Sequence, residues 1–243
     1  MVVALLTVGD ELLSGDTENT NATWLARRLS AAGVTVPRIL TVPDDEAVIA
    51  ESVRRFHGAF DAVVVTGGIG GTPDDVTKAG VAAAFDRDLV VPEDVRAHLV
   101  AKAERFADEN PDVVDRYELD LDLDAWAAIP EGGEPLLTDE SFAAGCVVES
   151  VYVMPGIPEE LKAMFATVAA DFGGDRTTET IHTPAPEGAV VSTIIEARER
   201  FSVAVGSYPR NGDTPGRVKV TGEDADLVTE AAAWLRERIE TVD

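Results

Sequence analysis

Four glycines within five positions follow a short apolar run in the first third of the chain. The run is Ala62–Val65, whose β-branched residues predict a strand covered on both faces. The glycines are Gly67, Gly68, Gly70 and Gly71. A backbone without side chains lets N–H groups approach a ligand closely, and a glycine turn before a helix can bind an anion. The alternative is a tight strand-to-helix turn without a ligand.

Two acids, Asp74 and Asp75, come directly after this turn. The segment from Thr72 to Asp75 holds N-cap residues and a proline, which predicts that a helix begins there. A phosphate site does not favour adjacent carboxylates unless a cation lies between them and the phosphate. Bases near these motifs are few: Arg27, Arg28 and Lys78. The pattern therefore predicts Mg²⁺, or another divalent cation, as the main positive charge for a phosphorylated ligand.

Two further acids, Asp10 and Asp44, also follow predicted strands. Asp10 comes after the apolar run Val2–Val8, and Asp44 comes after Val34–Val42. Strands and helices alternate over this part of the chain, which favours a parallel sheet with helices on both faces. Because the carboxyl ends of parallel strands meet at one edge, we expect these acids to lie beside the glycine turn. The alternatives are helix capping by Asp44 and Asp74 and a simple turn position for Asp10.

Two common nucleotide motifs do not fit the glycine turn. Gly68 and Gly70 lack the third glycine of the dinucleotide fingerprint, because Pro73 occupies its place. Lys78 follows Thr77, which is the wrong order for a Walker lysine.

The composition limits the classes of partner. The 243 residues carry 45 acids and 20 bases, a formal net charge of −25, which disfavours nucleic acid and anionic membranes as partners. This charge resembles that of proteins adapted to high salt, so most acids are expected to solvate the surface. Hydrophobic residues make up 45% of the chain, enough for a sizeable core.

Cysteine usage and the N-terminus favour a cytoplasmic location. Cys146 is the only cysteine, which excludes an internal disulfide, and its apolar neighbours favour a buried thiol over a nucleophile. The apolar N-terminal run is too short for a signal peptide or a membrane helix and has no basic flank.

The chain is predicted to hold two domains. Residues 1–172 are expected to form a three-layer α/β/α fold with a mostly parallel sheet, including strands at Asp88–Val91 and Cys146–Met154. Leu119–Asp124 alternates like an edge strand but fits an exposed acidic loop equally well. Residues 175–243 read as a small β-α-β-β-α module with an antiparallel hairpin.

Five segments together resemble a known family. They are Val8–Gly15, Asn19–Asn21, Val42–Asp44, Thr66–Thr77 and Met154–Phe165. In this order they resemble the molybdopterin-binding domain of molybdenum-cofactor biosynthesis proteins, of the MoaB/Mog type. The resemblance is strongest to the N-terminal domain of CinA (competence/damage-inducible) proteins in its stand-alone, haloarchaeal-type form. Val205–Pro209 is similar to part of the small module that follows this domain. The amidohydrolase domain of many CinA proteins has no counterpart, so deamidase activity is not expected.

The resemblance implies a ligand at the carboxyl edge of the sheet. In the molybdenum-cofactor enzymes that ligand is a pterin dithiolene phosphate, activated by adenylyl transfer with Mg²⁺. CinA-like domains are associated with metal-dependent cleavage of the pyrophosphate of ADP-ribose. The motifs imply catalytic roles for Asp44 and Asp75 and a metal role for Asp10, Asp74 and Asp75. The implied phosphate- and substrate-binding residues are Gly9, Asn21, Gly67, Gly68, Gly70, Gly71 and Thr72.

Two positions depart from the family pattern, and relatives suggest an assembly. Gly71 stands where the CinA pattern usually has proline, and Asp74 stands where the adenylyl-transferring branch has arginine. The loss of that arginine argues against pterin adenylylation. Relatives form dimers or trimers, so a homo-oligomer is expected. The competing interpretations are a phosphoanhydride hydrolase, a molybdopterin carrier without chemistry, and a structural subunit.

Overall fold

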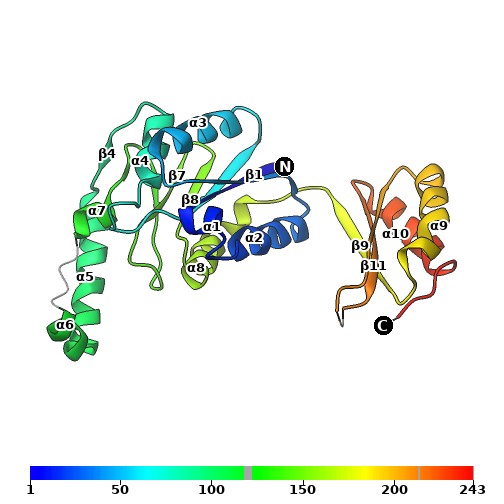
Figure 1. Cartoon of the computed structure of the whole chain (residues 1–243). Helices are drawn as coiled ribbons and strands as arrows, with labels where there is room; N and C mark the ends of the chain where they lie inside the picture. Colours follow the sequence, from blue (N-terminus) through cyan, green and yellow to red (C-terminus); the bar gives the residue numbers. More distant parts are fainter. Residues whose placement is uncertain (118–121, 213, 243) are drawn as a thin grey trace. The chain divides into compact units, whose positions relative to one another are not determined.

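The structure is a computed structural model that describes residues 1–117, 122–212 and 214–242. The chain separates into two compact units, which are each described separately below. One unit consists of Val2–Arg28 and Val36–Phe172, and the other of Met1, Leu29–Thr35 and Gly173–Asp243. Figure 1 shows the elements of both.

A six-stranded sheet forms the centre of the first unit, in the order β2-β1-β3-β8-β7-β6. Its strands are β1 (Val2–Val8), β2 (Thr35–Val42), β3 (Ala62–Thr66), β6 (Glu134–Leu136), β7 (Gly145–Val148) and β8 (Val151–Met154). β3 pairs in parallel with both β1 and β8, whereas β7 and β6 continue the sheet in antiparallel pairing. The predicted α/β class with a mostly parallel sheet is confirmed.

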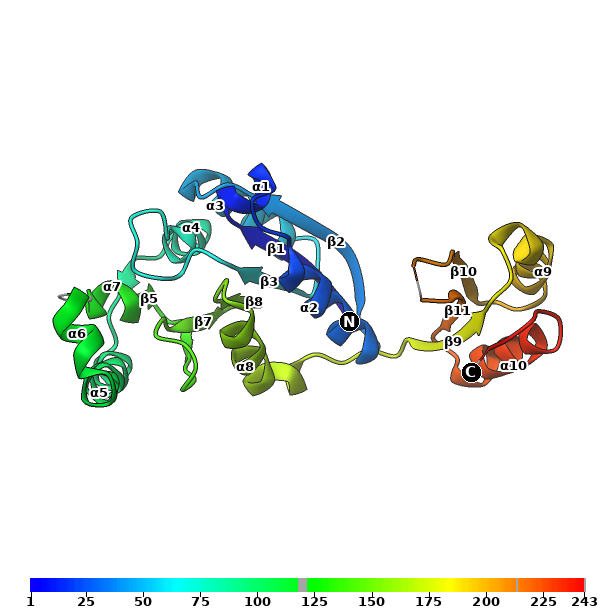
Figure 2. The same cartoon turned by 60° about the horizontal axis from the view of Figure 1, so that its bottom comes forward.

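Helices cover both faces of this sheet (Figures 1 and 2). α2 (Thr20–Ala31) and α8 (Pro158–Val168) lie on one side, and α3 (Glu46–His57) and α4 (Thr77–Ala84) lie on the other. Alternate residues of β1, such as Leu6 and Val8, join the core cluster that contains Ile49 of α3. Because successive strand residues point to opposite faces, the fully buried Leu5 serves the other layer. The fold therefore has the three expected layers.

A mostly helical segment lies between α4 and β6. It comprises β4 (Leu89–Val90), α5 (Glu93–Glu109), α6 (Pro111–Tyr117), α7 (Leu123–Ala127) and β5 (Ile129–Pro130). β4 is shorter than the strand expected at Asp88–Val91. It pairs antiparallel with β5 and lies outside the main sheet. The predicted edge strand at Leu119–Asp124 lies partly outside the described residues, and its last two residues begin α7.

The second unit has the predicted β-α-β-β-α order. β9 (Thr177–Thr183), β10 (Ala204–Tyr208) and β11 (Gly216–Gly222) form an antiparallel sheet in the order β10-β11-β9. α9 (Glu187–Arg200) and α10 (Ala225–Arg236) complete it, and their buried residues form one cluster with those of the strands.

The segment Cys146–Met154, predicted as strand material, forms two strands. β7 and β8 make a hairpin with Glu149 and Ser150 between them. Glu149 has a φ of 55°. Turns of this kind usually carry glycine, asparagine or aspartate, so nothing in the sequence marks this one. Elsewhere, no helix in the described part of the chain is long and apolar enough to cross a membrane.

The buried thiol of Cys146 gives a first prediction. Cys146 is fully buried in β7, and this burial raises the pKa of the thiol to about 12. Because the thiolate is the reactive form, we expect negligible reaction with a disulfide reagent in the native protein and complete reaction in denaturant. Absorbance of the released thiol anion measures both rates. Rapid modification of the native protein would show that Cys146 is accessible.

Candidate functional site

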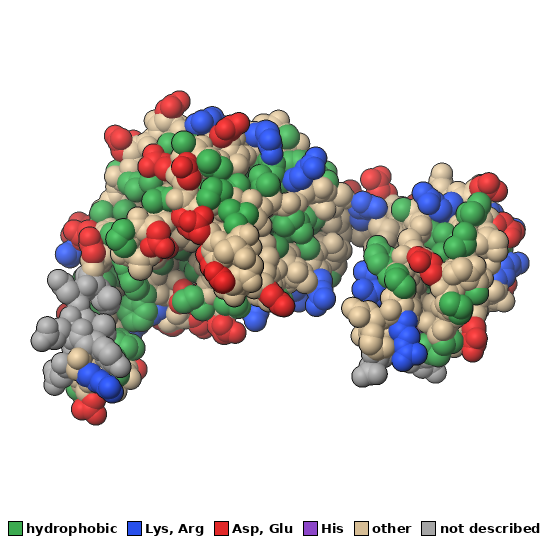
Figure 3. All heavy atoms as spheres, in the orientation of Figure 1, with side chains coloured by type: hydrophobic (Ala, Val, Ile, Leu, Met, Phe, Trp, Pro, Cys, Tyr) green, Lys and Arg blue, Asp and Glu red, His purple; other side chains and the backbone are tan. Residues whose placement is uncertain are grey.

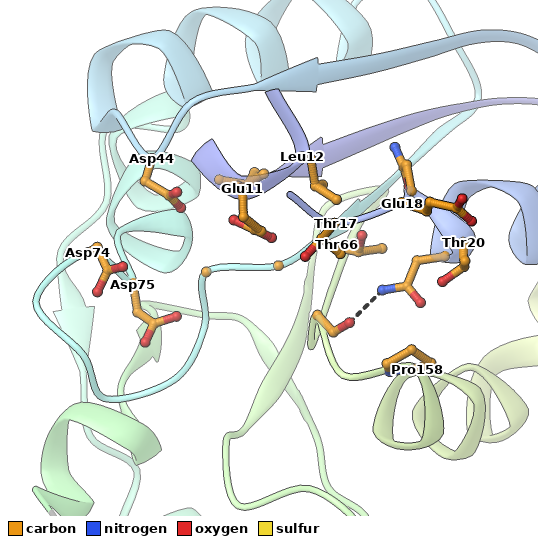
Figure 4. A pocket seen from close by; sticks show the side chains of 17 residues that line it. Glu11, Leu12, Thr17, Glu18, Thr20, Asp44, Thr66, Asp74, Asp75 and Pro158 are labelled. Atoms are coloured by element: carbon orange, nitrogen blue, oxygen red, sulfur yellow. Dashed lines mark hydrogen bonds between the residues drawn. The ribbon is translucent and has the colours of Figure 1, made fainter. Parts of the chain in front are cut away.

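A cleft of about 240 Å³ lies at the carboxyl ends of β1, β2 and β3. Its lining also includes the start of α8 and the segment between α1 (Asp10–Ser14) and α2. Figure 4 shows the carboxyl groups of Glu11, Asp44, Asp74 and Asp75 gathered at one end, with Glu18, Thr20 and Pro158 at the other. The lining residues are Val8, Gly9, Glu11, Leu12, Thr17–Asn21, Asp44, Thr66–Gly68, Asp74, Asp75, Gly156 and Pro158.

Two glycines of the predicted turn line the cleft. Gly67 has a φ of 97°, and a Cβ atom there would collide with the Val8 carbonyl oxygen. Gly68 has a φ of 62°, and a Cβ atom there would lie 2.5 Å from Thr77 Oγ1 and 3.3 Å from an Asp44 oxygen. Both positions therefore require glycine for conformation and for space.

The cleft backbone offers fewer free donors than the sequence suggested. Gly9 N donates to the Val42 carbonyl at 3.1 Å, and Gly67 N donates to the Met154 carbonyl at 3.2 Å. Gly68 N makes no hydrogen bond within the described part of the chain. Thr77 Oγ1 is buried and also lacks a partner among the described residues. Of the three predicted glycines that line the cleft, Gly68 alone keeps an N–H without a hydrogen bond among the described residues.

Gly70, Gly71 and Thr72 do not line the cleft. A Cβ atom on Gly70 would lie 2.7 Å from Asp75 Oδ2, and one on Gly71 would overlap the indole of Trp126. Thr72 donates to Asp75 Oδ2 from its backbone N, at 2.8 Å, and from its hydroxyl, at 2.5 Å. These residues shape the loop that carries Asp75.

The predicted helix start after the glycine turn was wrong. α4 begins at Thr77, and its N-cap position is Val76, without a side-chain cap. Thr72 to Asp75 instead form a turn in which Asp75 N donates to the Thr72 carbonyl at 2.9 Å. The two acids are thereby free of a capping role, and both line the cleft.

Asp44 joins two strand ends. Its Oδ2 accepts the N–H of Asp10 at 2.9 Å, which satisfies the first backbone donor of α1. The predicted capping of α3 by Asp44 was wrong, because Asp45 caps that helix by accepting from Val48 N at 3.0 Å. Burial raises the pKa of Asp44, and the nearby charges of Asp10, Glu11 and Asp74 raise it further, against the Asp10 hydrogen bond.

The remaining predicted residues divide between the cleft and its edge. Asp74 is exposed, and the Thr72 hydroxyl holds the pKa of its carboxyl below the usual value. Asn21 lines the cleft and donates to the Gly156 carbonyl at 2.6 Å, the bond drawn in Figure 4. Asp10 lies next to the cleft but does not line it; its neighbour Glu11 does. Glu11 and Glu18 were missed, since nothing in their spacing separates them from the many other acids.

The cleft contains acids and no bases. Glu11, Glu18, Asp44, Asp74 and Asp75 line it, without lysine, arginine or histidine. No group of three or more His, Cys, Asp or Glu among the described residues is arranged to hold a metal ion. Mg²⁺ is usually held by one or two carboxylates together with waters and ligand phosphates, and the donors present fit that arrangement. Figure 3 shows other carboxylates scattered over the visible surface of the chain.

A buried lysine secures the loop next to the cleft. Lys78 of α4 is 3% exposed, and its Nζ donates to the carbonyls of Ala125 and Trp126, both at 3.0 Å. Burial lowers the pKa of Lys78 to about 8, against the charge of Asp75. These bonds satisfy carbonyls at the end of α7 and hold Trp126, on which Gly71 packs.

Comparisons with known proteins place this chain in a family. Residues 4–172 match the family described as "Probable molybdopterin binding domain", and residues 176–242 match "FAD synthase, middle domain". A protein of Archaeoglobus fulgidus is 36% identical over 98% of this chain and 97% of its own length. A "CinA-like protein" of Citrifermentans bemidjiense is 32% identical over 98% of this chain, which spans 58% of that longer protein.

A solved structure agrees with these matches. The crystal structure of the protein CinA from Thermoplasma acidophilum superimposes with a TM-score of 0.60 and 30% identity, covering 71% of this chain and 99% of that one. The fold and the cleft define an α/β domain with an acidic cleft at the carboxyl edge of its sheet. The chain belongs to the family of probable molybdopterin-binding domains and is a CinA-like member of it.

The packing of Gly71 on Trp126 gives a second prediction. Gly71→Ala places a methyl group where the indole lies, so the loop or the ring must move, at a cost of about 1–3 kcal/mol. Urea denaturation measures this loss of unfolding free energy. Gly58→Ala is the control, because its added Cβ would meet only the Arg54 carbonyl, at 3.5 Å. Equal stability of the two variants would show that Gly71 is not confined by Trp126.

The environment of Asp44 gives a third prediction. Asp44→Asn keeps an acceptor for Asp10 N and removes a charge that burial and neighbouring acids disfavour. We expect Tm at pH 7 to rise on the order of 1–2 °C. Because the folded-state pKa lies above the unfolded value, the wild type gains relative stability as pH falls through that pKa, so the gap closes in acid.

Differential scanning calorimetry between pH 4 and pH 8 checks this expectation. Asp45→Asn is the matched control, because Asp45 lies outside the cleft and asparagine caps a helix as well as aspartate. A lower Tm for Asp44→Asn than for the control at pH 7 would contradict the prediction.

Proposed function

We propose that the cleft binds a phosphorylated pterin or nucleotide together with Mg²⁺ and cleaves a phosphoanhydride such as that of ADP-ribose. One observation carries the proposal. Five carboxylates and no bases line a cleft whose lining also includes Gly67 and Gly68, and the N–H of Gly68 is unpaired among the described residues. A diphosphate would be repelled there unless a divalent cation accompanied it.

We assign the binding of the cation and of the phosphate to different residues. Asp75 keeps one oxygen on Thr72, which leaves the other free for a cation. Gly68 N lines the cleft without a hydrogen-bond partner in the described part of the chain and is proposed to donate to a bound phosphate, with the buried, unpaired hydroxyl of Thr77 behind it. Bound Mg²⁺ would neutralise charge on the diphosphate.

Asp44 is proposed to accept the proton of the attacking water. Its raised pKa makes it a better proton acceptor than an ordinary aspartate. In the reaction, the oxygen of water forms a bond to one phosphorus and the bridging P–O bond breaks. The products from ADP-ribose are AMP and ribose 5-phosphate, and the proton passes through Asp44 to solvent.

The second candidate is a molybdopterin-binding protein without catalysis, or one related to the adenylyltransferases of molybdenum-cofactor biosynthesis. The family description favours binding of molybdopterin. Adenylyl transfer is the weaker form of this alternative, since no arginine lines the cleft and Asp74 occupies the place of the expected one. We also propose, from the family resemblance, that the protein acts as a homo-oligomer, a dimer or trimer, on a small molecule rather than on nucleic acid.

Hydrolysis of ADP-ribose tests the proposal. The assay quantifies AMP in molar KCl with Mg²⁺, Mn²⁺ or Co²⁺. We expect Asp75→Asn to lower turnover by about 10²-fold or more, because one metal-binding oxygen is lost. Asparagine can still accept from Thr72, so the loop is retained.

The matched control is Asp94→Asn, the same chemical change on an exposed residue of α5 outside the cleft. It should keep wild-type turnover. Unchanged activity in Asp75→Asn would remove Asp75 from the site. Absence of AMP with every metal would contradict the proposed hydrolase activity and favour the molybdopterin-binding alternative.

A further inference from the structure

A second groove adjoins the acidic cleft. It has a volume of about 440 Å³ and is lined by Glu18, Asn19, Thr20, Thr23, Trp24 and Arg27. The first three of these residues also line the cleft, so the two spaces share a wall. No motif that suggested the site in the sequence includes Trp24 or Arg27.

The wall between cleft and groove is fixed by hydrogen bonds. Asn19 Nδ2 donates to Thr7 Oγ1 at 2.9 Å, and Asn19 Oδ1 accepts from Ala22 N at 3.1 Å. These bonds hold the start of α2 against β1. The groove therefore keeps a constant position relative to the cleft.

The groove residues on α2 share one helical face. Thr20, Thr23, Trp24 and Arg27 are spaced at i, i+3, i+4 and i+7. The half-buried indole of Trp24 packs edge-on against Phe165 of α8, with ring centroids 5.5 Å apart. Arg27 is exposed and makes no ion pair or hydrogen bond within the described part of the chain. The indole of Trp24 is thus held between Phe165 and the guanidinium of Arg28, which lies 5.8 Å from the ring centre, whereas Arg27 stays uncommitted.

Size and charge both indicate what the groove accepts. The cleft, at about 240 Å³, falls below the usual 300–1,000 Å³ of small-molecule sites, whereas the adjoining groove adds about 440 Å³. The cleft provides carboxylates for a cation and a diphosphate, but no flat apolar surface. Aromatic side chains stack on heteroaromatic rings, and a guanidinium group donates to ring nitrogen and carbonyl acceptors.

We propose that Trp24 and Arg27 form the subsite for the heteroaromatic ring of the ligand, a purine or a pterin, whose phosphate chain extends past Asn19 into the acidic cleft. This inference rests on the proposed function, since it names the part of the same ligand that lies outside the cleft. Trp24 stacks on the ring, and Arg27 donates hydrogen bonds to its acceptors.

Calorimetric binding in molar KCl with Mg²⁺ tests the subsite. The probes are AMP, a pterin monophosphate and inorganic pyrophosphate, which has no ring. We expect Trp24→Leu to weaken binding of the ringed probes about tenfold and to leave pyrophosphate unchanged, while Trp24→Phe retains most of the affinity. Arg27→Gln, which changes no packing, should weaken the ringed probes alone. The probe that loses more identifies the ring as purine or pterin.

Arg55→Gln is the matched control, an exposed arginine of α3 outside both spaces. It should bind all three probes as the wild type does. Equal weakening of pyrophosphate, or no effect of Trp24→Leu and Arg27→Gln, would overturn the subsite and leave the proposed function standing. Wild-type protein that binds none of the probes would overturn both.

Discussion

The hydrogen bond from Asp10 N to Asp44 Oδ2 is the contact on which the site depends. It joins the end of β1 to the end of β2 at 2.9 Å, and the backbone bond from Gly9 N to the Val42 carbonyl lies beside it. Together they bring the first two strand ends to the glycine turn after β3. The cost is a partly buried carboxylate among other acids, which the raised pKa of Asp44 records. Unfavourable electrostatic environments of this kind are concentrated at functional sites. A residue that made the fold more stable there would serve the function less well.

The charge distribution gives the cleft its chemical character. On the face seen in Figure 3 the other acids are spread out and face water, so each is screened and contributes little. In the cleft five acids share a small space without a base. The five carboxylates repel one another. A cation that binds together with an anionic ligand, as we propose, would reduce this repulsion most simply. Arg27, in the adjoining groove, is the nearest uncommitted base on the lining of either space within the described residues.

The alternation of strands and helices as far as α4 and the β-α-β-β-α order of the second unit were predictable from the sequence, and so was the edge at which Asp44 and Asp75 meet. Periodicity and topology suffice for both, because parallel strands must end on the same side. Local geometry was not predictable. The choice between Asp44 and Asp45 as the cap of α3 depends on which one Asp10 N reaches across the sheet, and that is a tertiary contact. The hairpin turn at Glu149 lacks the glycine, asparagine or aspartate that usually takes up a positive φ, so the sequence does not mark its position.

The glycine turn shows why a motif cannot be interpreted position by position. Gly67 and Gly68 give space to the cleft, whereas Gly71 gives space to Trp126. The indole stays in place because Lys78, from the helix that follows the turn, donates to the carbonyls of Ala125 and Trp126. The glycine turn, helix α4 and the segment before β5 therefore hold one another in position. Any residue with a Cβ at position 71 would meet the same indole, so the glycine at this position and the close-packed position of Trp126 depend on each other.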